Sequence, residues 1–108
     1  MKKELEIPPA AEDDPQAFEI LRVWGAKREQ HVSISWDLWD DPATWGLFLA
    51  DLANHVANAF QQERGLDRNQ TLTAIQELFN KEIGNPTDSP QGKVLHKRRP
   101  HRKNVNQK

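Results

Sequence analysis

Hydrophobic and polar residues first alternate with a period of two, and later recur with the period of a helix. Residues 18–24 (FEILRVW) are rich in β-branched and aromatic side chains, and residues 31–36 (HVSISW) alternate between apolar and polar. Both patterns are typical of β-strands. The polar segment 25–30 between them is short and begins with Gly25, so a β-hairpin is the expected connection.

The glycine also suggests a register for this hairpin. If Gly25 pairs near Gln30, one face of the hairpin collects apolar cross-strand pairs, with Val23 opposite Val32 and Leu21 opposite Ile34. The other face is only half polar, and it carries Phe18, Ile20, Arg22, Trp24, His31, Ser33 and Ser35. The hairpin is therefore expected to carry apolar side chains on both faces, and the helices can pack against only the first of them.

The longest periodic segment is Asp40–Gly65, which predicts a long amphipathic helix. Asp41 is suited to cap its start, with Pro42 at the first helical position, and Gly65 is suited to end it. The apolar stripe is about 140° wide and comprises Trp45, Phe48, Leu49, Leu52, Ala53, Val56, Ala59 and Phe60. The opposite side carries Asp51, Asn54, Asn58, Gln61 and Gln62, and Leu47 projects among these polar residues.

A second helix is predicted over residues 68–83. Asp67 is its expected N-cap, and Gln70 follows three residues later, as in a capping box. The sequence 84–86 (GNP) ends the helix. Its apolar positions recur at helical spacing and are Leu72, Ile75, Leu78, Phe79 and Ile83.

These elements predict an α+β fold in which a β-hairpin is followed by two antiparallel helices (ββαα). Residues 1–17 form an extended or disordered lead-in, residues 18–86 the small α+β domain, and residues 87–108 a disordered basic tail. About 70 residues make a small core, and an isolated hairpin is marginal in water. We therefore expect a homodimer that completes the fold. The alternative is a monomer whose N-terminal segment folds over the half-polar face of the hairpin.

Composition narrows the possible classes of protein. The chain has 108 residues and no cysteine, which excludes disulfides, thiolate metal ligands and a cysteine nucleophile. It has no apolar run long enough to span a membrane and no apolar signal-peptide core near the N-terminus. A cytoplasmic protein without membrane contact is expected.

Charge is divided unevenly along the chain. All 16 acidic residues lie within residues 1–92, whereas residues 93–108 contain seven Lys or Arg and no acid. Such a run attracts phosphates in a salt-dependent and sequence-independent way. The tail therefore provides an alternative function, that of a nucleic-acid-associated accessory protein. The residues expected to carry it are Lys97, Arg98, Arg99, Arg102 and Lys103.

One pair of side chains is suited to acid–base chemistry. Asp51 and His55 are four residues apart on the long helix, so their side chains can meet. An aspartate can orient an imidazole as a general base, which leaves a small-ligand or enzyme site as a second alternative. The structural interpretation is a solvated pair on the helix surface. The sequence has no ligand spacing typical of a metal site, and no cofactor is expected.

The tryptophans at the hairpin–helix junction also allow two interpretations. Trp36, Trp39 and Trp45 can line an apolar pocket, or they can form the core that joins hairpin to helix; Trp36 and Trp45 fall on the predicted buried faces. Trp24 and Trp39 are the more exposed candidates. The candidate interaction surface consists of Trp24, Trp39, Leu47, Asp51, Asn54, His55 and Asn58.

Several stretches together resemble a known family. They are PPAAEDDPQAFEILRVW, HVSISWDLWDDPATWGLFLADLANHVANAF and NPTD. This combination is similar to a family of short bacterial proteins known only as a domain of unknown function, over roughly residues 8–88. The resemblance implies a single compact domain and carries no activity or cofactor with it. The sequence thus favours a non-enzymatic, homodimeric protein-interaction module whose partner it does not identify.

Overall fold

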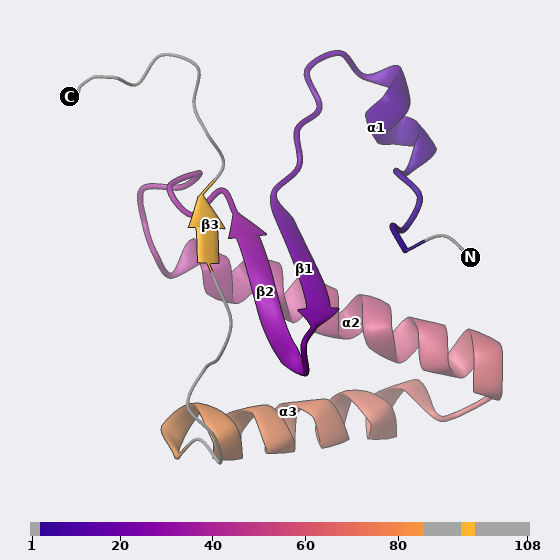
Figure 1. Cartoon of the computed structure of the whole chain (residues 1–108). Helices are drawn as coiled ribbons and strands as arrows, with labels where there is room; N and C mark the ends of the chain where they lie inside the picture. Colours follow the sequence, from indigo (N-terminus) through magenta and orange to yellow (C-terminus); the bar gives the residue numbers. More distant parts are fainter. Residues whose placement is uncertain (1–2, 86–93, 97–108) are drawn as a thin grey trace. The chain divides into compact units, whose positions relative to one another are not determined.

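The computed structural model describes residues 3–85 and 94–96, the side chains being described for residues 3–85. The chain divides into two compact units. Of the described residues, the first unit contains 3–36 and 94–96, and the second contains 37–85. The elements confirm the predicted α+β class, in which an antiparallel hairpin precedes two long helices (Figure 1).

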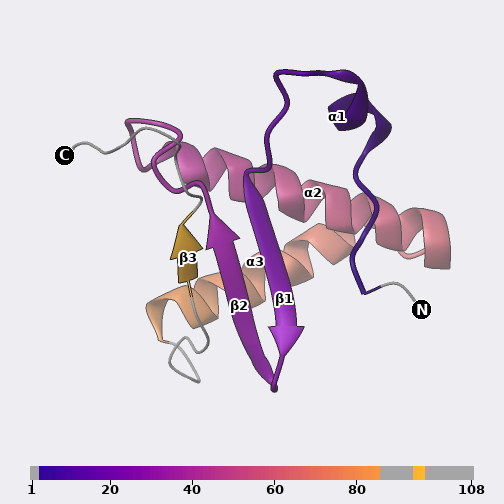
Figure 2. The same ribbon diagram turned by 45° about the horizontal axis from the view of Figure 1, so that its top comes forward.

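The first unit is built on a sheet with the strand order β1-β2-β3. Strands β1 (Leu21–Ala26) and β2 (Glu29–Ile34) are antiparallel, and β3 (Val94–His96) runs parallel to β2 on its other side (Figures 1 and 2). The predicted register is confirmed, with Leu21 opposite Ile34, Val23 opposite Val32 and Gly25 opposite Gln30. The strands predicted over residues 18–24 and 31–36 lie two or three residues closer to the turn in the structure, but they pair as predicted.

The hairpin turn is tighter than the sequence suggested. The strands include Ala26 and Glu29, so only Lys27 and Arg28 lie in the loop, and both have positive φ angles (54° and 62°). Two-residue loops with positive φ at both positions are type I′ turns, which favour Asn and Gly. Gly25, in contrast, has an ordinary strand position just before the turn.

Two elements appear in segments for which no regular structure was predicted. The short helix α1 (Pro9–Asp13) lies within the lead-in, where the Ala11 and Glu12 amides donate to the carbonyl of Pro8. Strand β3 lies within the predicted tail and occupies the edge of β2. In both cases a short segment that has no strong periodicity of its own becomes ordered through hydrogen bonds.

The second unit is a pair of helices, α2 (Thr44–Arg64) and α3 (Arg68–Gly84). The predicted ends at the connection are confirmed. Gly65 has a left-handed φ of 69°, and its amide donates to Gln61, while the Asp67 carboxylate accepts from the Gln70 amide at 2.9 Å. Among the described residues, no helix is long and apolar enough to cross a membrane.

The start of α2 differs from the prediction. Asp41 does not cap a helix that begins at Pro42. Its carboxylate instead accepts from the Ala43 amide at 2.9 Å in a preceding turn, and the regular helix begins at Thr44. Asp41 therefore still satisfies a free amide, but within a turn that leads into the helix.

The orientation of α2 also requires a correction. Arg68 of α3 bonds to Asn54 and Asn58, which the sequence placed on the polar side of α2. Ala57, between them in sequence, has no exposed surface. Four members of the predicted buried stripe are instead exposed, namely Ala59 and three large side chains, at 43% for Leu49, 38% for Leu52 and 46% for Val56. Polar side chains of α2 thus contact the start of α3, whereas much of the predicted apolar stripe remains exposed.

Candidate interaction surface

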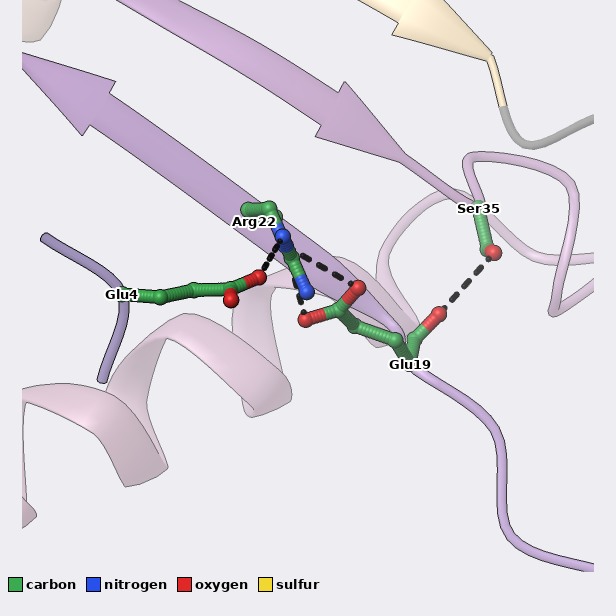
Figure 3. Close-up of polar contacts among 4 residues, drawn as sticks. All are labelled: Glu4, Glu19, Arg22 and Ser35. Atoms are coloured by element: carbon green, nitrogen blue, oxygen red, sulfur yellow. Dashed lines mark hydrogen bonds and ion pairs between the residues drawn. The ribbon is translucent and has the colours of Figure 1, made fainter. Parts of the chain in front are cut away.

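Arg22 is the centre of a charged cluster on β1 (Figure 3). Its Nε donates to both carboxylate oxygens of Glu19, at 3.1 and 3.2 Å, and its Nη1 donates to Glu4. The hydrogen bond to Glu19, and then the one to Glu4, raise the pKa of Arg22 above its ordinary value. Arg22 therefore stays charged and links the N-terminal segment to the sheet.

Ser35 extends this cluster toward the end of β2. The residue is buried, its amide donates to the carbonyl of Ile20 at 3.0 Å, and its hydroxyl donates to the carbonyl of Glu19 at 3.4 Å (Figure 3). The hydroxyl therefore has a structural partner. The two hydrogen bonds of Ser35 hold the backbone at Glu19 and Ile20, next to Arg22 at the start of the hairpin.

Trp24 is half-buried on β1, two residues from Arg22 and directly opposite His31. It borders an open depression together with residues 3–6, and a second open depression follows the hairpin over residues 23–30. Neither depression includes Asp51 or His55. Trp24 is thus the member of the candidate surface that the structure places beside the N-terminal segment.

The helix pair contains a second polar cluster, centred on Arg68. Its Nε donates to Asn58 Oδ1 at 2.7 Å, and its Nη2 donates to Asn54 Oδ1. Asn54 itself donates to the carbonyl of Ala50 at 3.0 Å. Two residues of the candidate surface, Asn54 and Asn58, therefore hold α3 against α2.

Trp39 takes part in an aromatic cluster within the helical unit. Its ring lies 5.0 Å from that of Trp45 in an edge-to-face arrangement and 5.9 Å from that of Phe48. Such geometry stabilises aromatic pairs beyond the burial of their area. Trp39 is half-buried, whereas Trp36, which the alternation placed on the apolar face, is 55% exposed.

The remaining candidates form an exposed row on α2. Leu47, Asp51 and His55 follow one another at intervals of four residues, and Leu47 is 66% exposed. No hydrogen bond or ion pair between Asp51 and His55 is found among the described residues. The two side chains are thus arranged as separate surface groups, next to an apolar one.

The two arginines at the centres of these clusters were not singled out by the sequence. Arg68 carried a usable signal, because a cation in the first turn of a helix lies at the positive end of the dipole and needs another partner. Arg22 carried none, since Glu4 lies 18 residues away in sequence. The five basic tail residues proposed for nucleic-acid binding lie outside the described residues, so that alternative stays a prediction.

The residues that the structure describes include no group of three or more His, Cys, Asp or Glu side chains placed to hold a metal ion. The polar side chains that do gather are paired with each other, in the clusters around Arg22 and Arg68. Contacts within the chain therefore account for the polar side chains of these two clusters.

Comparisons with known proteins agree with this fold. A model of the family described as a domain of unknown function (DUF5076) matches residues 4–87. A search of the curated proteins finds no match. Among solved structures, the chain is similar to a "putative pyruvate dehydrogenase" from the photosynthetic bacterium Rhodopseudomonas palustrus CGA009. The two are 30% identical, with a TM-score of 0.65, and the match covers 84% of this chain and 93% of the other.

Proposed function

We propose that this chain, which belongs to the family described as a domain of unknown function (DUF5076), is a non-enzymatic interaction module that associates with a second copy of itself. The observation that carries the proposal is the exposed apolar stripe of α2. Leu49, Leu52 and Val56 lie on one face of the helix and are each more than a third exposed. A helix with such a face is normally packed against a partner.

The helix α3 does not supply that partner. Its contact with α2 uses Asn54 and Asn58, and α3 carries exposed apolar residues of its own, namely Leu78, Phe79 and Ile83. Exposed apolar area costs about 25 cal/mol per Å², so contiguous patches of this kind are uncommon on monomers. Both helices therefore favour association.

The interior of the chain supports the same proposal. Ala57 is the one fully buried apolar residue among those the structure describes. Chains of this size bury too little apolar surface to be stable without a further source of stability, such as a second subunit. A symmetric homodimer is the commonest solution among soluble proteins.

The similar solved structure is described as a putative pyruvate dehydrogenase, and this activity is not carried over to the present chain. The polar side chains that gather in the described residues serve structural roles. Arg22 binds Glu4 and Glu19, and Arg68 binds Asn54 and Asn58. The exposed apolar stripe of α2, in contrast, has no such structural role within the described residues.

Light scattering on the full chain tests the proposal. We expect a species of twice 12.5 kDa at high micromolar concentration. Leu52→Glu places a charge in the exposed stripe and should weaken self-association at least about tenfold. Gln62→Glu, on the polar side of the same helix, is the matched control and should leave association unchanged. A single species of 12.5 kDa at these concentrations would overturn the proposal.

Leu47→Glu and Trp24→Glu extend the test to the surface proposed from the sequence. Either change should weaken capture of the second copy while leaving the helical circular dichroism signal unchanged, because Leu47 is exposed and Trp24 is only half-buried. If both variants associate like the unaltered chain, these two residues lie outside the interface.

A further inference from the structure

Among the residues that the structure describes, no strand pairs with the outer edge of β1. In the strand order β1-β2-β3, β2 has a neighbour on each side, whereas β1 is paired on one side only. Strand edges of this kind present unpaired backbone groups that can template pairing with another chain. The edge of β1 is therefore a surface at which an incoming strand can add to the sheet.

The register shows which groups the edge presents. The Ser35 amide donates to the carbonyl of Ile20, so Ile20 belongs to a hydrogen-bonded pair. Hydrogen-bonded and non-hydrogen-bonded pairs alternate along an antiparallel ladder. Like Ile20, Arg22 and Trp24 therefore direct their N–H and C=O groups toward β2. Leu21, Val23 and Gly25 consequently direct their N–H and C=O groups away from β2.

No hydrogen bond to these outward groups is found among the described residues. The N-terminal segment comes near β1, but it is held there by the side-chain contact between Glu4 and Arg22 (Figure 3). Leu5, the next residue of that segment, is 93% exposed. The segment therefore leaves the backbone edge of β1 without a partner.

We propose that β1 of a second copy pairs with this edge in an antiparallel manner, across a two-fold axis at Val23, to form one continuous sheet. This inference rests on the proposed self-association and adds to the α2 stripe a second contact between the two copies, made by the hairpins. In this register Val23 lies opposite the partner's Val23, and Leu21 lies opposite the partner's Gly25. All three outward residues are then used, for about six hydrogen bonds. A register shifted by two residues would use fewer of these groups. A shift in one direction would place Gly25 beyond the end of the partner's strand, and a shift in the other direction would place Leu21 opposite the partner's turn.

The side chains of β1 are self-complementary in this arrangement. On one face, the two Val23 side chains would join the apolar pairs of both hairpins into a continuous surface. On the other face, Arg22 would lie opposite the partner's Trp24, where a guanidinium can stack on an indole ring. A two-fold axis creates both contacts at once, which favours a second copy over an unrelated strand.

The strand also lacks the features that usually block such pairing. Natural edge strands carry proline, lysine or a bulge that discourages an incoming strand. The sequence of β1, LRVWGA, contains neither proline nor lysine, and its ladder to β2 runs without a bulge. Its single charge, on Arg22, is already neutralised by Glu4 and Glu19.

Cysteine crosslinking tests the register directly, since the chain has no cysteine of its own. In the full-length Val23→Cys protein, the two Cα atoms would lie about 5.5 Å apart, within the range that a disulfide spans. We expect most of the protein to become a covalent dimer under mild oxidation with copper phenanthroline, and to revert on reduction.

The matched control is Leu21→Cys, on the same strand and the same face. Its Cα would lie about 15 Å from that of the partner's Leu21, so crosslinking should be at least about tenfold less. Adding Gly25→Cys to Leu21→Cys places two cysteines opposite each other and should restore the crosslink. This recovery would exclude a general loss of reactivity at residue 21.

The outcomes separate this inference from the proposed function. If light scattering shows a dimer but Val23→Cys crosslinks no better than Leu21→Cys, the edge inference is wrong and self-association stands. If the full chain is a monomer, both are wrong. Hydrogen exchange at several dilutions tests a third outcome. If the amides of Leu21, Val23 and Gly25 stay equally protected at every dilution, the chain's own N-terminal segment occupies the edge. That result also overturns the inference.

Discussion

Arg68, at the start of α3, donates a hydrogen bond from Nε to Asn58 Oδ1 on α2 at 2.7 Å. A cation in the first turn of a helix is unfavourable by itself, because that end carries a partial positive charge. The contact with Asn58, together with the one to Asn54, offsets this cost. The start of α3 is thus joined to α2 by polar contacts.

Removing the Arg68 side chain should therefore loosen the helix pair. We expect Arg68→Ala to lower the free energy of unfolding by about 1–2 kcal/mol, since hydrogen bonds to a charged group are lost. Arg68→Lys should recover only part of this, because a lysine cannot present the two-pronged donor geometry. Urea unfolding at a fixed protein concentration measures the change.

The control for this prediction is Gln62→Ala, an exposed substitution on α2 that should change the free energy of unfolding by less than about 0.5 kcal/mol. A double-mutant cycle between Arg68→Ala and Asn58→Ala should show coupling. If the two substitutions are strictly additive, the contact does not stabilise the helix pair.

Two glycines of the helical unit should respond in opposite directions to alanine. Gly65 has a φ of 69°, so Gly65→Ala should lower the free energy of unfolding by about 1–2 kcal/mol. Gly46 lies inside α2 without a positive φ, and Gly46→Ala should raise it by about 0.5 kcal/mol. A Cβ at either position meets no atom within 4 Å, so the difference isolates backbone conformation.

Thermal unfolding of these two variants is the measurement. Equal effects of the same sign at Gly65 and Gly46 would contradict the left-handed assignment of Gly65. The end of α2 at this residue would then require a cause other than the conformational freedom of glycine.

The ion pair between Arg22 and Glu4 should hold the N-terminal segment near the sheet. We expect Glu4→Gln to lower the heteronuclear NOE of amides 3–8 in nitrogen-15 relaxation measurements, because the amide cannot replace the charge. The overall stability should change little, as for other exposed ion pairs. High salt should have the same effect on the unaltered chain.

Glu6→Gln is the control for this experiment, since no ion pair joins Glu6 to Arg22 among the described residues. Its relaxation profile should match that of the unaltered chain. Identical profiles for Glu4→Gln and Glu6→Gln would mean that other contacts hold the segment.

The hairpin turn should be open to stabilisation. Lys27 and Arg28 both occupy the left-handed region, which costs bulky side chains about 1–2 kcal/mol each. Replacing them by Asn and Gly, the residues that type I′ turns favour, should raise the free energy of unfolding by about 1 kcal/mol or more. Chemical denaturation gives the value.

The double alanine variant at these positions removes both charges but keeps the unfavourable φ angles, so it should show no gain. A gain of equal size in both variants would trace the effect to the charges and contradict the conformational explanation.

The sequence predicted the features that depend on neighbours along the chain. The hairpin register followed from pairing Gly25 with Gln30, and the connection between the helices followed from Gly65 and Asp67. The apolar stripe predicted for α2 is half-buried at four of its eight positions and exposed at the other four, because such a stripe shows that a partner is needed without showing which one. Of the candidate surface, Asn54 and Asn58 turned out to bind Arg68.

By itself, then, the sequence determined the two strands of the hairpin, their register, and the ends of the helices at Gly65 and Asp67. Each of these depends on local rules: the alternation of side chains, the φ angle that a helix end requires, or a carboxylate within reach of a free amide. Only the tertiary structure decided that Ala57 would be buried, that Glu4 would reach Arg22, and that β3 would lie beside β2. Those contacts join residues that are distant along the chain, and their energies depend on the path of the folded backbone, which no local pattern encodes.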